Sequence, residues 1–228
     1  MIKEISVFLP AYNDGKTIGK LVLDAISVLD PSGLDYEIII IDDCSRDETG
    51  EVAQKLAKDH TRVKWVRHTE NRDYGGVLKS GFAHATKAWI FYTDGDGQYD
   101  IKEMTRLLPY AGEYDLINGG ILKRQDSFFR VIASKIYQLC LDSLFGKTLT
   151  YINCDFRLMR KEAIDRIKID SNSGFAPAEM VVRLVRSGVK VKEVLVSHFP
   201  RQYGHSQFLN LKKILHILRD MTTFLARK

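Results

Sequence analysis

The sequence has few cysteines and no long apolar run. Its three cysteines, Cys44, Cys140 and Cys154, form no CxxC pair, which argues against a disulfide framework and against a zinc site. No apolar run approaches the roughly 18 residues that a membrane-spanning helix needs. The chain enters a strand-like segment directly, without a signal-peptide pattern. We therefore expect a cytoplasmic protein that is either soluble or peripheral on a membrane face.

Charge of one sign is not concentrated in this chain either. The 34 Lys and Arg residues are scattered among 29 Asp and Glu residues until the C-terminal third, so we expect no nucleic-acid partner. The net charge of +5 suits a phosphorylated ligand or a membrane surface. A hydrophobic content of 45% in 228 residues, with no repeat or linker, predicts a single domain over residues 1–228.

Short apolar runs alternate with segments of helical periodicity in the first half. The predicted strands are residues 5–9, 36–41, 63–66 and 88–92, and the predicted helices are residues 16–29, about 47–58 and 74–87. Asp14 is the expected N-cap of the first helix. This βαβαβαβ order with short links predicts an α/β fold, in which an open, mostly parallel sheet carries helices on both faces.

The second half is less regular. We expect strands at 115–118, 154–159 and 191–196, and helices at about 127–144 and 176–187. A C-terminal helix at about 208–226 is amphipathic and basic. Such a helix either lies on an anionic membrane or packs on its own domain, and the sequence favours neither.

Polar motifs follow three of the predicted strands. They are residues 10–14, Asp42-Asp43 and Asp94-Gly95-Asp96. Ligands of open α/β sheets bind at the carboxyl ends of the strands, so we expect these motifs to form one site.

Asp94 and Asp96 are two carboxylates separated by one glycine, and Gln98 adds an amide oxygen. Mg²⁺ and Mn²⁺ prefer such oxygen ligands and bridge them to phosphates. A plain Asp-Gly turn is the alternative for an isolated triplet. An EF-hand is excluded, because Tyr99 and Thr105 stand where that loop needs Gly and Glu.

Asp42 and Asp43 could accept hydrogen bonds from a ribose or from a base N–H. A helix cap is the alternative, although Ser45 or Asp47 alone would suffice for it. The stretch Gly15-Lys16-Thr17 is not the end of a phosphate-binding P-loop, because Pro10 occupies the first glycine position of that motif.

Taken together, these motifs resemble the inverting family 2 glycosyltransferases of the GT-A fold, and most closely the dolichol-phosphate or polyprenyl-phosphate sugar synthases. The motifs that carry the resemblance are Pro10-Ala11-Tyr12-Asn13, the segment 42–49, Asn71 with Gly75-Gly76, Lys79 and Gly81, the DxDxQ of residues 94–98, Arg130 with Ser134, and Arg201-x-x-Gly204-x-Ser206. One departure is Gln207, which stands where the last motif usually has Lys.

The resemblance implies three groups of site residues. Residues that would bind the nucleotide-diphosphate sugar are Pro10, Tyr12, Asn13, Asp14, Asp42, Asp43, Gly76, Lys79, Asp94 and Gly95. Ligands of Mg²⁺ or Mn²⁺ would be Asp94, Asp96 and Gln98, with Asp96 catalytic. Residues that would bind the acceptor or its phosphate are Arg124, Arg130, Ser134, Arg201 and Ser206.

The implied reaction moves a sugar from a GDP- or UDP-linked donor, such as GDP-mannose, UDP-glucose or UDP-N-acetylglucosamine, with inversion. A polyprenyl phosphate is the expected acceptor, and as an ionised nucleophile it needs no strong base. A saccharide hydroxyl is the alternative acceptor and would need one, for which Glu179 and Asp155 are the candidates.

Two further classes compete with this interpretation. A nucleotidyltransferase would show a glycine-rich basic loop after the first strand, which residues 10–16 lack. A non-enzymatic metal- or phospholipid-binding module would use the same acids and basic tail. The lone histidines, His68 among them, are interpreted as structural or solvent-facing.

Overall fold

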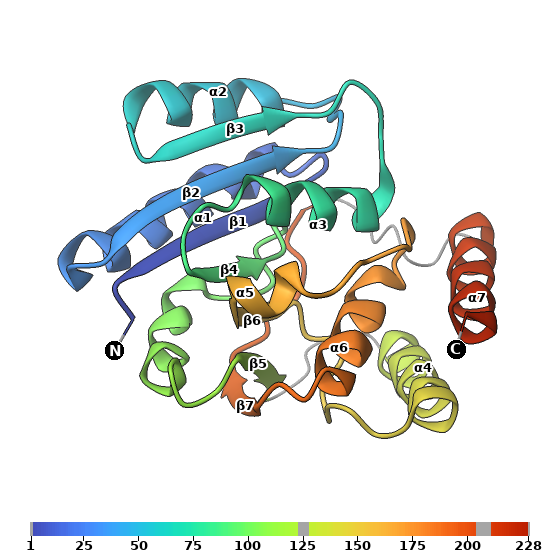
Figure 1. The fold of residues 1–228 in the computed structure, drawn as a ribbon. Helices are drawn as coiled ribbons and strands as arrows, with labels where there is room; N and C mark the ends of the chain where they lie inside the picture. Colours follow the sequence, from blue (N-terminus) through green and yellow to red (C-terminus); the bar gives the residue numbers. More distant parts are fainter. Residues whose placement is uncertain (1, 123–127, 204–210, 228) are drawn as a thin grey trace.

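The computed structural model describes residues 2–122, 128–203 and 211–227, and Figure 1 shows their arrangement. Seven strands join one sheet in the order β3-β2-β1-β4-β6-β5-β7. The strands are β1 (Glu4–Ala11), β2 (Asp35–Asp42), β3 (Val63–Arg67), β4 (Trp89–Thr93), β5 (Leu116–Ile121), β6 (Phe156–Arg160) and β7 (Val191–Val196). The α-helices are α1 (Gly15–Leu29), α2 (Thr49–Asp59), α3 (Asp73–His84), α4 (Phe128–Phe145), α5 (Lys161–Asp165), α6 (Ala176–Arg186) and α7 (Leu211–Ala226). Short 3-10 turns, η1 (Asp30–Ser32), η2 (Ile101–Arg106) and η3 (Leu108–Tyr110), complete the chain.

The sheet is mostly parallel, which confirms the predicted α/β class. Strands β3, β2, β1 and β4 are parallel neighbours, and so are β5 and β7. Strand β6 runs antiparallel to both β4 and β5. The apolar pattern of residues 154–159 predicted a strand there but carried no information about its direction.

Strands β1 and β2 are buried on both faces, which explains their continuous apolar runs. In β2, Ile38 and Ile40 pack in one hydrophobic cluster, whereas Ile39 and Ile41 pack in the cluster on the opposite face. Helices α1 and α2 and turn η2 belong to the first cluster, and helices α3 to α7 belong to the second. Helices therefore cover both faces, as predicted (Figure 1).

Helix α3 is shorter at its end than the apolar pattern predicted. It stops at His84 instead of residue 87. The amide of Thr86 donates to the carboxylate of Glu37 (2.7 Å), and the amide of Lys87 donates to Ser6 Oγ (3.0 Å). These amides are therefore drawn out of the helical hydrogen-bond pattern by buried acceptors on the sheet.

The amphipathic helix α7 packs on its own domain, the alternative that the sequence left open. The rings of Phe224 on α7 and Phe145 at the end of α4 lie 5.3 Å apart, and Phe224 lies 5.7 Å from Phe175. Figure 1 shows α4 and α7 side by side at one end of the molecule. None of the helices in the described residues is both apolar enough and long enough to cross a bilayer.

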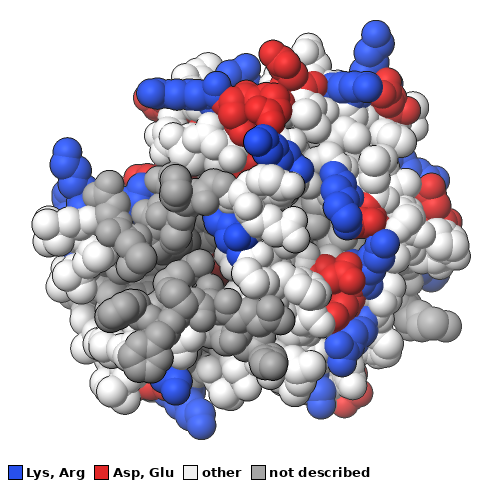
Figure 2. All heavy atoms as spheres, turned by 180° about the vertical axis from the view of Figure 1, so that it is seen from behind, with Lys and Arg blue, Asp and Glu red and all other residues white. Residues whose placement is uncertain are grey.

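Lysine and arginine side chains are spread over one face of the molecule. Figure 2, which views the molecule from behind, shows their side chains interleaved with aspartate and glutamate around the described part of that face.

Candidate active site

A cavity of about 370 Å³ opens at the edge of the sheet where β1, β2 and β4 end. Its lining residues are Pro10, Ala11, Tyr12, Asn13, Asp14, Asp43, Asn71, Asp73, Tyr74, Val77, Asp94, Gly95, Asp96, Gln98, Ser173, Gly174, Arg201, Lys213, His216 and Ile217. Parallel strands place their carboxyl ends at the same edge, so the three sequence motifs that follow β1, β2 and β4 meet here.

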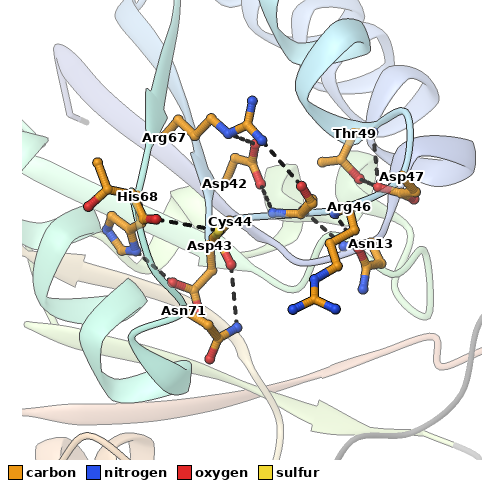
Figure 3. A network of polar contacts seen from close by, with 12 residues as sticks. Asn13, Asp42, Asp43, Cys44, Arg46, Asp47, Thr49, Arg67, His68 and Asn71 are labelled. Carbon is orange, nitrogen blue, oxygen red and sulfur yellow. Dashed lines mark hydrogen bonds and ion pairs between the residues drawn. The ribbon is translucent and has the colours of Figure 1, made fainter.

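The loops after β1 and β2 hold each other through side chains, as Figure 3 shows. Asn13 adopts a positive φ of 57°, and its Oδ1 accepts from the amide of Arg46 at 2.9 Å. The carboxylate of Asp47 accepts from the amide of Gly15 (3.1 Å) and from that of Thr49 (3.0 Å), so one residue caps the starts of both α1 and α2. These contacts fix the first wall of the cavity.

Asp14 occupies the predicted N-cap position of α1, but its side chain does not cap the helix. Its carboxylate turns back and accepts from the amide of Tyr12 at 3.0 Å. Burial raises the pKa of Asp14 to about 6, the Tyr12 amide lowers it, and the charge of Asp96 adds to the increase. Asp14 thus presents a carboxylate to the cavity at an energetic cost.

The two acids that end β2 have different surroundings. Asp42 is fully buried; its Oδ1 accepts from the amide of Ser45 at 2.9 Å, and its Oδ2 lies 3.6 Å from Arg67 Nε. Asp42 does not line the cavity, whereas Asp43 does. Successive residues of a strand point to opposite sides, and only the second acid points toward the cavity. The structure therefore places Asp42 at the buried end of β2, where it supports the loop that follows.

Asp43 is held in place by three groups, two of which appear in Figure 3. Its Oδ1 contacts His68 Nδ1 (2.6 Å) and accepts from the amide of Arg72 (2.9 Å), while its main-chain oxygen accepts from Asn71 Nδ2 (3.3 Å). His68 Nε2 in turn lies 2.8 Å from Ser80 Oγ on α3. His68 is buried, in agreement with the structural interpretation of this histidine.

Asp94 and Asp96 follow β4 in a loop that lies against the end of β1. The amide of Gly95 donates to the main-chain oxygen of Pro10 at 3.0 Å, and a Cβ at Gly95 would lie 2.5 Å from that oxygen. Only glycine fits between the two carboxylates at this distance. The amide of Gln98 donates to Asp96 Oδ1 (3.0 Å), which closes the turn.

Negative charge accumulates around Asp94. Burial, together with the charges of Asp155 and Asp96, raises the pKa of Asp94 well above its ordinary value, while the hydroxyl of Tyr74, which donates to Asp94 Oδ1 at 2.5 Å, acts against the shift. Carboxylates crowded into a buried place favour a bound cation. Within residues 2–122, 128–203 and 211–227, no three His, Cys, Asp or Glu side chains are arranged to hold a metal ion by themselves. The residues fit a cation that shares its coordination with a ligand.

The side-chain amide of Gln98 has a nitrogen that donates hydrogen bonds and an oxygen that can bind a cation. Its amide nitrogen donates to the main-chain oxygen of Phe199 at 3.1 Å, and the residue lines the cavity. As a metal ligand it would use its amide oxygen, so that prediction is compatible with the observed contact.

Asp155 lies close enough to Asp94 to raise its pKa, but it does not line the cavity. Its Oδ1 is paired with Arg157 Nη1 at 2.5 Å and accepts from the hydroxyl of Tyr92 at 3.1 Å. Arg157 is fully buried in β6 and also donates to Asn118 Oδ1 at 2.7 Å. The carboxylate of Asp155 is thus occupied in a buried network.

Three further predicted site residues lie outside the cavity lining. Glu179 is fully buried; its carboxylate accepts from the amides of Asp170 (3.1 Å) and Ser171 (2.9 Å) and pairs with Arg183 at 2.8 Å. Lys79 reaches the same loop through Asn172 Oδ1 at 2.5 Å. Gly76 lies under Arg72, where a Cβ would lie 2.5 Å from that side chain. All three residues contact other parts of the protein and not the cavity, so their surroundings indicate a structural role.

The predicted acceptor residues divide into three groups. Arg201 lines the main cavity. Ser134 on α4 lines a second cavity of about 260 Å³, together with Lys135 and Asn153, and Asn153 Nδ2 donates to Ser134 Oγ at 3.1 Å. Arg124 and Ser206 lie outside the described residues, and although Arg130 belongs to α4, its side chain is not among those described.

Several lining residues were not among the predicted site residues. Tyr74 follows the Asn71 of a recognised motif, so inspection of that motif could have suggested it. Ser173 and Gly174 precede α6, and Lys213, His216 and Ile217 belong to α7. These residues lie far from the acidic loops in the sequence, and only the tertiary fold brings them to the cavity.

An α/β sheet of this topology, with an acidic loop and a second carboxylate in one cavity, is the arrangement expected of a glycosyltransferase of the GT-A fold. The family described as Glycosyl transferase family 2 matches residues 6–168, and the chain belongs to this family.

A sequence comparison agrees with this membership, and a structural comparison shows the same fold. The undecaprenyl-phosphate 4-deoxy-4-formamido-L-arabinose transferases of Salmonella paratyphi B and Salmonella newport are each 30% identical over 231 residues, which covers 99% of this chain and 68% of theirs. Glucosyl-3-phosphoglycerate synthase from Mycobacterium tuberculosis has the same fold. Its complex with Mn²⁺, UDP-glucose and phosphoglyceric acid superposes with a TM-score of 0.71, at 17% identity, covering 99% of this chain and 79% of that one. The complex with Mg²⁺ and UDP gives a TM-score of 0.72, at 18% identity and the same coverage.

Proposed function

We propose that this protein transfers a sugar, with inversion, from a nucleotide-diphosphate sugar to a polyprenyl phosphate. The observation that carries the proposal is that Asp43, at the end of β2, and the Asp94–Asp96 loop, at the end of β4, line one cavity. A nucleoside bound at Asp43 and a diphosphate bound at the Asp94–Asp96 loop would together span this cavity. The Salmonella relatives, whose names state an undecaprenyl-phosphate acceptor, support the choice of acceptor.

In this proposal Asp43 receives hydrogen bonds from the base or the ribose. A carboxylate only accepts hydrogen bonds, so it selects donors such as an imide N–H or a hydroxyl. His68 and the Arg72 amide fix one oxygen of Asp43 and so set the direction of the other. Both UDP- and GDP-linked donors offer suitable N–H groups. UDP bound to the structural neighbour favours testing uridine donors first.

Asp94 and Asp96 would hold Mg²⁺ or Mn²⁺, with Gln98 as an additional oxygen ligand. Such an ion neutralises the diphosphate leaving group. Asp94 and Asp96 orient the diphosphate through this contact, and the close packing of Gly95 on Pro10 keeps their loop rigid. The crystal structures of the structural neighbour in complex with Mn²⁺ or Mg²⁺ support a divalent metal at this site.

The surroundings of the two candidate bases favour a phosphate acceptor over a saccharide hydroxyl. Glu179 is buried among amides and Arg183, and Asp155 is paired with Arg157. An ionised phosphate needs no base, only groups that place it. Arg201 at the main cavity and Ser134 with Lys135 at the second cavity are such groups.

We also propose that the end of the molecule formed by α4 and α7 rests on the membrane that supplies the lipid, as a peripheral contact at the cytoplasmic face. Large apolar side chains on both helices are exposed, among them Leu139 (67%) on α4 and Leu211 (71%) and Leu215 (58%) on α7. Lys135 and Lys212 lie on the same helices and suit anionic lipid head groups.

A transfer assay tests the proposed function. The purified protein would be incubated with Mn²⁺, radiolabelled UDP- or GDP-sugars, and either undecaprenyl phosphate or a saccharide acceptor. We expect label to move to the lipid and not to the saccharide. Asp96→Ala should lose this transfer and the metal-dependent binding of nucleotide diphosphate while keeping its fold. Transfer to the saccharide alone, or label released as a nucleotidyl product, would contradict the proposal.

A further inference from the structure

The segment that carries Arg201 is bound directly to the acidic loop after β4. The amide of Phe199 donates to the main-chain oxygen of Gln98 (2.8 Å), and Gln98 Nε2 donates back to the main-chain oxygen of Phe199 (3.1 Å). Tyr99 and His198 form a bridge of the antiparallel type. The segment that carries Arg201 is therefore held against this loop by contacts of His198 and Phe199, which do not depend on the side chain of Arg201.

From this position Arg201 reaches one of the proposed metal ligands. Its Nη2 lies 2.6 Å from Asp96 Oδ2, and its side chain is 24% exposed. The other oxygen of Asp96, Oδ1, already accepts from the amide of Gln98. Both oxygens of Asp96 thus have partners in this structure, and the ion pair uses the one that the main chain leaves available.

The charges around the cavity favour this ion pair. Three carboxylates, those of Asp14, Asp94 and Asp96, line the cavity together with Arg201. Lys213 also lines the cavity, and its Nζ lies 3.8 Å from Asp73 instead of at the acidic loop. Arg201 is thus the cation that compensates Asp96.

We propose that Arg201 is the resident counter-ion of the metal site, and that a divalent cation and the Arg201 guanidinium exchange places on Asp96. This inference rests on the metal site of the proposed function. Mg²⁺ binds carboxylate oxygens at about 2.0–2.1 Å. A guanidinium in contact with the same oxygen would face the ion at short range, and the two positive charges repel each other.

The exchange gives Arg201 a second position. Displaced from Asp96, its planar fork remains tethered through Phe199 and can pair with phosphate oxygens beside the metal. Metal binding would then release the Arg201 guanidinium for a phosphate. As a consequence, the metal and the phosphate would bind cooperatively.

The test measures Mn²⁺ binding to the nucleotide-free protein by the electron paramagnetic resonance signal of free Mn²⁺. Arg201→Gln removes the competitor, and we expect it to bind Mn²⁺ roughly tenfold more tightly, the factor that corresponds to one lost charge-assisted contact. Lys213→Gln is the matched control: it also removes one positive charge from the cavity lining but leaves the Asp96 contact, and its effect should be clearly smaller.

A second titration adds UDP. We expect Arg201→Gln to bind UDP in the presence of Mn²⁺ more weakly than the wild type, because the phosphate loses its arginine. The two effects have opposite signs, which a general loss of structure would not produce. If Arg201→Gln does not fold, Arg201→Lys, which keeps the charge and loses the fork, should shift both affinities in the same directions by less.

Unchanged or weaker Mn²⁺ binding in Arg201→Gln overturns the exchange, as does an effect no larger than that of Lys213→Gln or an absence of Mn²⁺ binding in all variants. These outcomes are independent of the sugar-transfer assay. A wild-type protein that shows the exchange but transfers no sugar would count against the proposed function only.

Discussion

At the scale of single residues, the site is dominated by carboxylates that the fold holds close together. Asp14, Asp94 and Asp96 all line one cavity, and Asp155 lies near enough to raise the pKa of Asp94. Crowding of like charges in one cavity is typical of sites that bind a cation or act on phosphate.

Asp14 provides a pH-dependent test of this crowding. Its pKa in the folded protein is about 6, raised from 3.8 mainly by burial. Its contribution to stability is therefore fully present below pH 3.8 and is lost as the pH rises through about 6. We expect Asp14→Asn to remove this part of the pH dependence and to raise the free energy of unfolding at pH 7 by about 1–3 kcal/mol.

Urea melts between pH 4 and 7 in EDTA measure this effect. Asp165→Asn, at an exposed carboxylate, is the control and should leave the profile unchanged. A wild-type profile that runs parallel to that of Asp14→Asn would contradict the assigned shift.

Glu179 distinguishes a structural role from a catalytic one. It holds the loop at residues 170–171 through two amides and pairs with Arg183. Because Glu179→Gln weakens charge-assisted hydrogen bonds in a buried place, we expect a loss of about 1–3 kcal/mol in the free energy of unfolding. The turnover of the folded fraction should stay close to that of the wild type.

Paired measurements of urea denaturation and initial rates test this expectation. Glu162→Gln, which removes an exposed carboxylate from a salt bridge with Arg166, should change neither quantity. A collapse of turnover in Glu179→Gln at unchanged stability would restore Glu179 as the candidate base.

At the scale of elements, the site depends on how closely α3 approaches the sheet. A Cβ at Gly81 would lie 2.4 Å from the ring of Phe8 on β1. At Gly75 it would lie 2.4 Å from the main-chain oxygen of Ser171. The glycines of α3 thus serve helix–sheet and helix–loop packing, a role that the sequence motif at residues 71–81 did not reveal.

Gly81→Ala tests this packing. Alanine favours a helix over glycine by about 1 kcal/mol, but displacing Phe8 costs about 1–3 kcal/mol, so we expect a net loss of stability. Gly19→Ala in α1 is the matched control, because its Cβ would meet only Val52 Cγ1, at 3.3 Å. It should be neutral or stabilising in the same urea titration. Two variants of equal stability would contradict the close approach.

At the scale of the whole molecule, α7 connects the cavity to an exposed apolar surface. Lys213, His216 and Ile217 line the cavity, while Leu211, Leu215 and Leu218 of the same helix are exposed. A single helix could therefore contact a membrane and a lipid-linked substrate at the same time.

Vesicle flotation tests the membrane contact. We expect the double variant Leu211→Ser, Leu215→Ser to bind vesicles containing phosphatidylglycerol at least about tenfold more weakly, because each buried leucine contributes about 1.5–3 kcal/mol. Leu23→Ser, at a 49% exposed leucine of α1 on the opposite face of the sheet, is the control. Equal binding of all three proteins would show that α7 does not touch the bilayer.

The sequence alone determined the strands of the first half and the positions of the acidic motifs at their ends. A strand buried on both faces is a continuous apolar run, and a motif that follows it directly shares its position at the sheet edge. The antiparallel direction of β6, α5 and the 3-10 turns were not predictable, because they depend on packing between distant segments.

The tertiary structure decided which of these residues face the cavity. It placed Asp43 in the lining and Asp42 behind it, buried Glu179 among amides, and brought Arg201 onto Asp96 across 105 positions of sequence. A side chain's direction and partner are set by the whole set of contacts around it, whereas the local pattern of a sequence fixes only the element that carries it.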